Sequence, residues 1–153
     1  MKKIFAALIF SFIFSISVNA QSSYKTAIGV KFYPGAFTIK HFITPEKHAL
    51  EGLLYLWSHG TRITGLFEFH NAIDPVNGLK WYVGPGAHIG FFSNKYGGGT
   101  SFGVDGVIGL DYKFNNVLIN LSVDWQPSIE FNTDNGGDSF LGDWAGIGIR
   151  YTL

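Results

Sequence analysis

The chain has 153 residues, no cysteine, and 11 basic side chains against 11 acidic ones. A nucleic-acid-binding surface requires a basic excess, so nucleic acid is excluded as a partner. A lipid anchor attached through a cysteine thioether is also excluded. The chain contains 20 glycines, 17% aromatic residues and only 14% charged residues, a composition that favours β-strands.

The first 20 residues (1–20) have the pattern of a secretory signal peptide. Two lysines near the start precede a run at 4–16 that is apolar apart from two serines, and 18–20 offers a small-residue cleavage site. This run is shorter than the ~20 residues of a membrane-spanning helix, and no later run approaches that length. The sequence therefore predicts a cleaved signal peptide and one exported domain at 21–153, which carries nine basic and 11 acidic side chains.

Eight segments in this domain place apolar residues at every second position, a period that predicts β-strands. The seventh is the clearest, because Val117, Ile119, Leu121, Val123 and Trp125 alternate with polar residues. In the fifth, Pro85 predicts a bulge or bend, since proline cannot donate to a strand ladder. The predicted strands are 24–33, 37–43, 49–57, 61–70, 79–92, 102–114, 117–126 and 144–153, with a polar, acidic loop at 132–143.

Three features indicate that the apolar face of these strands contacts lipid. Several segments exceed the five or six residues that are common in soluble strands and reach the ~9–11 needed to span a bilayer. The polar face mixes small residues with a few charges of both signs, as a crowded interior would. Aromatic residues occur near segment ends, as in membrane-barrel girdles: Tyr33, Trp57, Trp81, Tyr112, Trp125 and Tyr151.

These features predict an all-β fold, an eight-stranded antiparallel up-and-down transmembrane β-barrel. A secreted soluble barrel of the lipocalin type, with its apolar face inward, is the alternative fold. The final strand, 146–153, resembles the C-terminal assembly signal of outer-membrane proteins, carried by Ile149, Tyr151 and Leu153, although Leu stands where Phe is commoner. The segments 84–90, 103–114 and 119–127 resemble small outer-membrane barrels of the OmpA/OmpX type, in a Bacteroidetes-like form.

The resemblance implies that both chain ends face the periplasm and that the connections at 34–35, 58–60, 93–100 and 132–143 face outward. It implies outer-membrane lipid, lipopolysaccharide and the assembly machinery as partners, with an unknown extracellular ligand. An eight-stranded barrel is just wide enough for its own side chains, so we expect the inward charges to pair with one another. The expected interior charge network is Lys31, Lys40, Glu51, Arg62, Glu68, His88, Asp105, Asp111, Asp124 and Arg150, with Lys25 and Lys113 also inward and His88 meeting Glu68 or Asp105.

A filled interior favours a structural or surface-interaction role over a small-solute channel. A lipid A-modifying enzyme is a second alternative, but Ser58 and His59 are adjacent and should point apart, so no catalytic residue is predicted. The five histidines do not have metal-ligand spacing, and the acidic residues Glu130, Asp134, Asp138 and Asp143 do not have that of a calcium loop. No cofactor or metal is predicted.

Overall fold

The computed structural model describes residues 24–58, 60–92, 98–132 and 138–153. Within these residues, no helix is long and apolar enough to cross a membrane. Ten strands follow one another along the described chain: β1 (Thr26–Phe32), β2 (Ala36–Thr44), β3 (His48–Trp57), β4 (Gly60–Ala72), β5 (Leu79–Phe92), β6 (Gly99–Lys113), β7 (Ile119–Trp125), β8 (Ser128–Asn132), β9 (Asp138–Leu141) and β10 (Ala145–Thr152).

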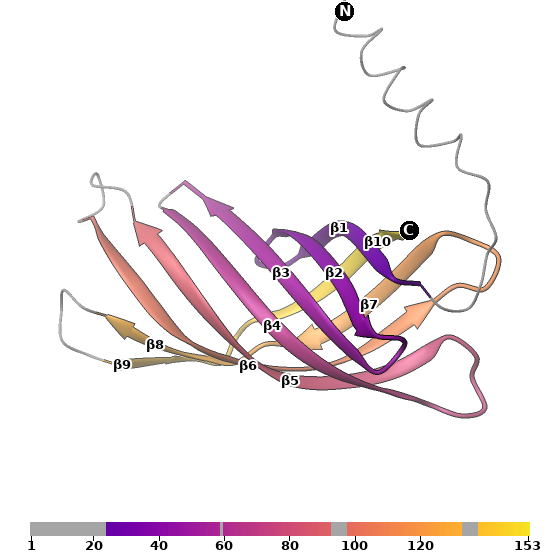
Figure 1. The fold of residues 1–153 in the computed structure, drawn as a ribbon. Helices are drawn as coiled ribbons and strands as arrows, with labels where there is room; N and C mark the ends of the chain where they lie inside the picture. Colours follow the sequence, from indigo (N-terminus) through magenta and orange to yellow (C-terminus); the bar gives the residue numbers. More distant parts are fainter. Residues whose placement is uncertain (1–23, 59, 93–97, 133–137) are drawn as a thin grey trace, which may run out of the picture.

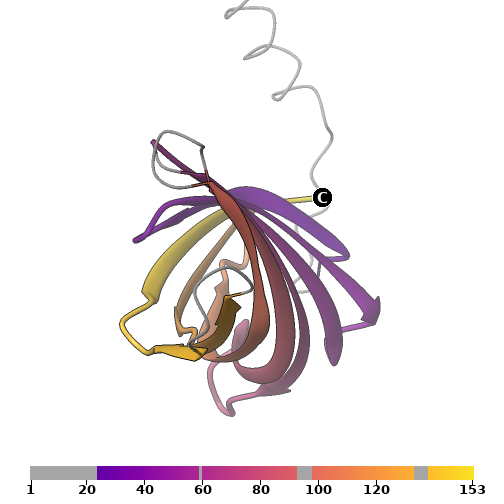
Figure 2. The same cartoon turned by 90° about the vertical axis from the view of Figure 1, so that its left-hand side faces the viewer.

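The strands form a closed antiparallel barrel (Figures 1 and 2). Each strand from β1 to β6 pairs with the next, β6 pairs with β7, β7 pairs with β10, and β10 returns to β1. The closing ladder runs from Ala27 opposite Thr152 to Phe32 opposite Ile147. Because β8 and β9 extend β7 and β10, the ring has eight strands. The predicted eight-stranded antiparallel fold is confirmed.

The last two strands are each divided into two pieces, which the sequence did not indicate. Pro127 interrupts the seventh strand, since it has no N–H to donate, and β8 continues beyond it on the edge of β6. The predicted loop at 132–143 is wrong for Asp138–Leu141, which forms β9 and pairs with β8. A hydrogen bond of 2.7 Å from Trp125 Nε1 to the Gly142 carbonyl holds the bend before β10.

Pro85 interrupts the ladder between β4 and β5 without adding a residue to its strand. The β4–β5 ladder is interrupted between the pairs Leu66–Gly86 and Phe69–Val83, yet the register is the same on both sides. A Cβ at Gly84 would collide with the Phe67 carbonyl oxygen, so glycine permits a close approach of the two backbones there. The bulge alternative for Pro85 is therefore wrong.

The barrel has an apolar outside and a polar inside. Every strand places large apolar side chains on the outer face, with Phe37, Leu56 and Ile147 each more than half exposed. Among the described strand side chains, no Asp, Glu, Lys or Arg is exposed. Two side chains differ from the prediction. Lys25, just before β1, is exposed, and Trp57 points inward because it shares the phase of Glu51.

The two ends of the barrel differ in what they carry. Backbone hydrogen bonds join Thr26 to Leu153, so the start of β1 and the residue after β10 lie together at what we call the proximal end. The connections after β2, β4 and β6 lie at this end, and β1, β3, β5 and β8 each finish at the opposite, distal end (Figure 1).

Candidate functional site in the barrel interior

The proximal half of the interior is organised around the Lys40 ammonium. Its Nζ lies 2.8 Å from Glu68, 3.4 Å from Glu51 and 3.7 Å from Asp111, which come from three other strands. The same nitrogen lies 4.3 Å from the centre of the Tyr82 ring. Lys40 is fully buried, and a buried charge is tolerated only when it is paired, so one lysine neutralises part of a three-carboxylate cluster.

Arg150 completes this proximal cluster from β10. Its Nη2 forms an ion pair with Glu51, and Thr38 donates to the same carboxylate over 2.5 Å. The guanidinium also donates to Thr38, Asn120 and Ser122 over 2.8–3.3 Å. A planar guanidinium with five donors suits such a divergent set of acceptors, so Arg150 on β10 connects groups on three other strands, β2, β3 and β7.

Tyr24, just before β1, contributes its phenol to the proximal cluster. Its hydroxyl donates to Asp111 over 3.4 Å, and Asn120 donates to the same carboxylate over 2.8 Å. Burial, reinforced by the Asp111 charge, raises the pKa of the Tyr24 phenol well above its ordinary value. Tyr24 therefore stays neutral and acts as a donor.

A second cluster fills the distal half of the interior. Lys31 forms an ion pair with Asp124 and donates to Gln126 over 3.2 Å. Tyr55 donates to the same amide oxygen over 3.0 Å, and Tyr82 donates to Asp124 over 2.8 Å. Each of these side chains is at most 4% exposed, so the cluster crosses the lumen without leaving a polar atom in contact with the outer face.

Asp105 is the acceptor that extends the distal cluster toward the distal end. It accepts from Arg62 over 2.5 Å and from Gln126 over 3.1 Å. The ring nitrogen His88 Nδ1 lies 2.7 Å from its other oxygen, while His88 Nε2 faces Glu130 at 3.7 Å. His88 therefore meets Asp105 as expected, and it is His70 that contacts Glu68, at 2.8 Å.

Inward glycines provide the room for these long side chains. A Cβ at Gly146 would collide with the Lys31 side chain, and one at Gly148 would crowd Ser122 and the Arg150 guanidinium. The Gly146-Ile-Gly148-Ile-Arg150 alternation therefore has a packing role, because small and large residues must alternate across a narrow lumen.

The structure brings all ten residues of the expected network into the interior, where each is buried. Lys113, which was also expected to point inward, is buried as well, and the structure adds two buried residues that the expected network did not include: His70 and Lys80. Lys80 could have been found from the alternation along β5, because it lies on the same face of the strand as the inward-pointing Tyr82 and His88. Outside the network, Ile149, Tyr151 and Leu153 lie on or just beyond β10, and Ile149 and Leu153 are exposed.

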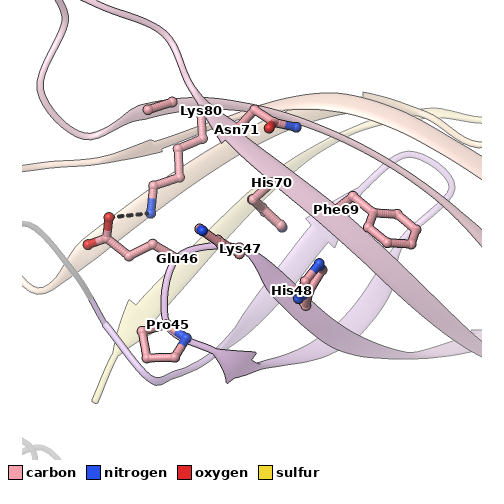
Figure 3. A pocket seen from close by; sticks show the side chains of 9 residues that line it. Pro45, Glu46, Lys47, His48, Phe69, His70, Asn71 and Lys80 are labelled. Carbon is pink, nitrogen blue, oxygen red and sulfur yellow. Dashed lines mark ion pairs between the residues drawn. The ribbon is translucent and has the colours of Figure 1, made fainter.

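The proximal rim contains an open cavity of about 600 Å³ between the β2–β3 turn and the start of β5 (Figure 3). Lys80 reaches from β5 toward Glu46 in the turn, with 3.5 Å between Nζ and Oε2. Because Glu46 is about half exposed, water screens this pair, unlike those of the interior. The cavity lies at the entrance to the proximal cluster, with His70 on its wall.

Among the described residues, no group of three His, Asp or Glu side chains could hold a metal ion. Those of the four acidic residues considered for cation binding that the structure describes form no such group. Glu130 lies in β8 beside His88, Asp143 is exposed before β10, and Asp134 lies outside the described residues. His59, considered with Ser58 for catalysis, also lies outside them.

The closed ring, its apolar outside and its charged inside define a small β-barrel with a filled interior. A solved structure shares this fold, the N-terminal β-barrel domain of Pseudomonas aeruginosa OprF. The two chains align with a TM-score of 0.57 and 20% identity, over 87% of this chain and 98% of that domain. The resemblance to small outer-membrane barrels is thus confirmed for the fold. No family model matches the sequence, and no curated protein matches it.

Proposed function

We propose that this protein is an integral outer-membrane β-barrel whose interior is filled by its own side chains. The observation that carries the proposal is the inverted distribution of polarity, with apolar residues outside on every strand and all described strand charges inside. A contiguous apolar surface of this extent is unfavourable in water and matches the lipid-facing band of a membrane barrel.

Strand length supports the same assignment. A tilted strand needs about 9–11 residues to cross a bilayer, and β4, β5 and β6 have 13, 14 and 15 residues. In the proposed orientation the proximal end faces the periplasm, where the signal peptide delivers the chain. The outer-face residues Ile149, Tyr151 and Leu153 are the proposed contact for the assembly machinery, and lipopolysaccharide is the proposed outer-leaflet neighbour.

The proposed role is structural or in surface interaction, through the distal connections. Ion pairs and hydrogen bonds that join opposite walls support it, since Lys40 on β2 reaches Asp111 on β6 and Tyr55 on β3 reaches Gln126 beyond β7. These side chains occupy the space that a solute would need. A channel or a lipid A-modifying enzyme remains an outcome of the tests below.

Gel migration of the membrane fraction with and without heating tests the membrane assignment. We expect a folded band that shifts on boiling, because membrane barrels stay folded in detergent until heated. Recovery of the protein in the soluble fraction, with the same gel migration before and after heating, would contradict the assignment and support the lipocalin-like alternative.

Planar-bilayer recordings of the refolded protein test the filled interior. We expect no stable conductance steps, and regular single-channel steps would replace the structural role with the channel. Mass spectrometry of lipid A from cells with and without the protein separates the remaining candidate. An altered acyl pattern would establish the enzyme.

A further inference from the structure

A cavity of about 360 Å³ lies inside the distal end of the barrel, above the distal charge cluster. We call it the distal cup and define it by six of its lining residues: Trp57, Arg62, Phe92, Ser101, Glu130 and Trp144. They come from β3, β4, β5, β6, β8 and the connection before β10. Its volume is at the lower end of the range for small-ligand sites, so it suits one ring better than a chain of rings.

One side of the distal cup is aromatic. The rings of Trp57 and Trp144 lie 5.8 Å apart at an interplanar angle of 62°, and Tyr55 supports both from below at 5.0–5.8 Å. The Arg62 guanidinium stacks 4.2 Å from the Trp144 ring centre. Indole rings combine a large flat apolar face with little loss of side-chain entropy on binding, so this wall is suited to a ligand with a flat C–H face.

The other side of the distal cup is polar and incompletely satisfied. The Ser101 hydroxyl is 1% exposed and has no hydrogen-bond partner among the described residues. His88 Nε2 is also buried and has no hydrogen-bond partner among the described residues, since Glu130 lies 3.7 Å away, beyond hydrogen-bonding distance. A buried polar group without a partner costs about 1–3 kcal/mol, so these atoms need a polar partner that the described residues do not supply.

Two glycines shape the polar side. A Cβ at Gly90 would crowd the Ser101 hydroxyl, and one at Gly103 would collide with the His88 ring. The absence of side chains there lets the serine lean over β5 and the imidazole lie across β6 toward Glu130. The donors and acceptors are therefore directed to one side of the distal cup.

We propose that the distal cup binds a single sugar ring. A sugar has a C–H face that packs on indole and hydroxyl groups that both donate and accept. It can thus satisfy a carboxylate, a hydroxyl and an imidazole nitrogen together. The Arg62 guanidinium that lines the distal cup is already paired with the Asp105 carboxylate, so the ligand does not have to supply a negative charge. The source of the sugar, a soluble glycan or a lipid headgroup at the outer surface, rests on the orientation proposed above.

Saturation-transfer difference NMR on the refolded full chain in phosphocholine micelles tests this proposal. The probes are the methyl glycosides of glucose, galactose, mannose and N-acetylglucosamine. We expect transfer from aromatic protons to the ring protons of at least one probe. Absence of transfer to all four probes would overturn the proposal and leave the distal cup as a water-filled space.

Variants test where the sugar binds. Trp57→Ala should abolish the signal, and Ser101→Ala and Glu130→Gln should each weaken binding about tenfold, the usual effect of losing a hydrogen bond in a binding site. Trp81→Ala on the outer face and Glu46→Gln on the proximal rim are matched controls and should leave binding unchanged.

Equal signals from wild type and the distal-cup variants would overturn the site. If Trp57→Ala does not give a heat-shifted band, Ser101→Ala decides, because it removes one atom. Repeating the NMR measurement in vesicles with and without lipopolysaccharide separates a soluble glycan from a lipid headgroup as the source of the sugar. If the headgroup is the source, its sugars should displace the probes. A chain that shifts on heating but binds no probe overturns this inference alone. A chain that binds a probe but is recovered as a soluble protein overturns the membrane assignment alone.

Discussion

Replacing Arg150 by methionine should destabilise the barrel more than almost any other conservative change. Methionine retains much of the length of the side chain but removes the charge and all five donors. The guanidinium is fully buried and contacts Glu51, Thr38, Asn120 and Ser122. Its loss removes one partner from a buried carboxylate and from three polar groups.

The magnitude follows from how much of the cluster survives. Removing one member of a buried ion pair costs about 3–5 kcal/mol. Glu51 keeps Lys40 at 3.4 Å and the Thr38 hydroxyl, which places the expected loss near the lower limit, about 3–4 kcal/mol. Arg150→Met combined with Glu51→Leu removes both charges. Because replacing a whole buried pair by apolar residues is often neutral, the double variant should be more stable than either single variant.

Urea unfolding of the protein in lipid vesicles, followed by the heat-shifted band, provides the free energies. Ile149→Val is the matched control, since Ile149 is the outward-facing neighbour of Arg150 and is 42% exposed. We expect less than about 1 kcal/mol for this control. An Arg150→Met protein within about 1 kcal/mol of wild type would refute the reasoning. The reasoning would also be refuted if the double variant lost as much free energy of unfolding as the two single variants together.

Three further changes test the fold and its surroundings. Val123→Arg, on the outer face of β7, should lower the free energy of unfolding in vesicles by about 2–4 kcal/mol. Val117→Arg in the adjoining turn should lower it by no more than about 1 kcal/mol. Equal losses for the two variants would contradict a lipid-facing outer surface. Gly84→Ala should greatly reduce the yield of the heat-shifted band, because the added Cβ would collide with the Phe67 carbonyl oxygen. Gly65→Ala, whose added Cβ meets open space, should give a normal yield. Normal yields for both variants would contradict the close approach of the β4 and β5 backbones at Gly84. Glu46→Gln breaks only a partly exposed ion pair and should change the urea midpoint by an amount equivalent to less than about 1 kcal/mol.

Much of the barrel could be predicted from the sequence because a strand has a period of two. Alternation assigned the inner or outer face correctly along β1 to β7, including Glu51 on the weakly patterned β3. It failed for β9, a strand of four residues whose pairing with β8 decides its conformation. Short segments with polar neighbours carry too little periodicity to separate a strand from a loop.

The members of the interior network were predictable, but their pairing was not. The contact between Arg150 and Glu51 joins residues 99 positions apart, and that between Lys31 and Gln126 joins residues 95 apart. Which inward residues share a level depends on the stagger of the strands around the ring, and alternation within one strand contains no information about stagger. The distal cup was missed for a related reason, since Trp57 was assigned to the outer face by its place near a strand end rather than by its phase.

The pairing of opposite walls constrains the order in which the protein can assemble. Lys40 and Asp111 lie on strands four places apart in the ring of eight, so they meet only when the sheet has curled round. An open sheet, before β1 joins β10, would present these charges without partners. Transfer of single strands into lipid would then expose bare charges to hydrocarbon, at a cost of several kcal/mol each. In the proposed membrane barrel, formation of the β1–β10 seam is thus the step at which the chain becomes compatible with a bilayer.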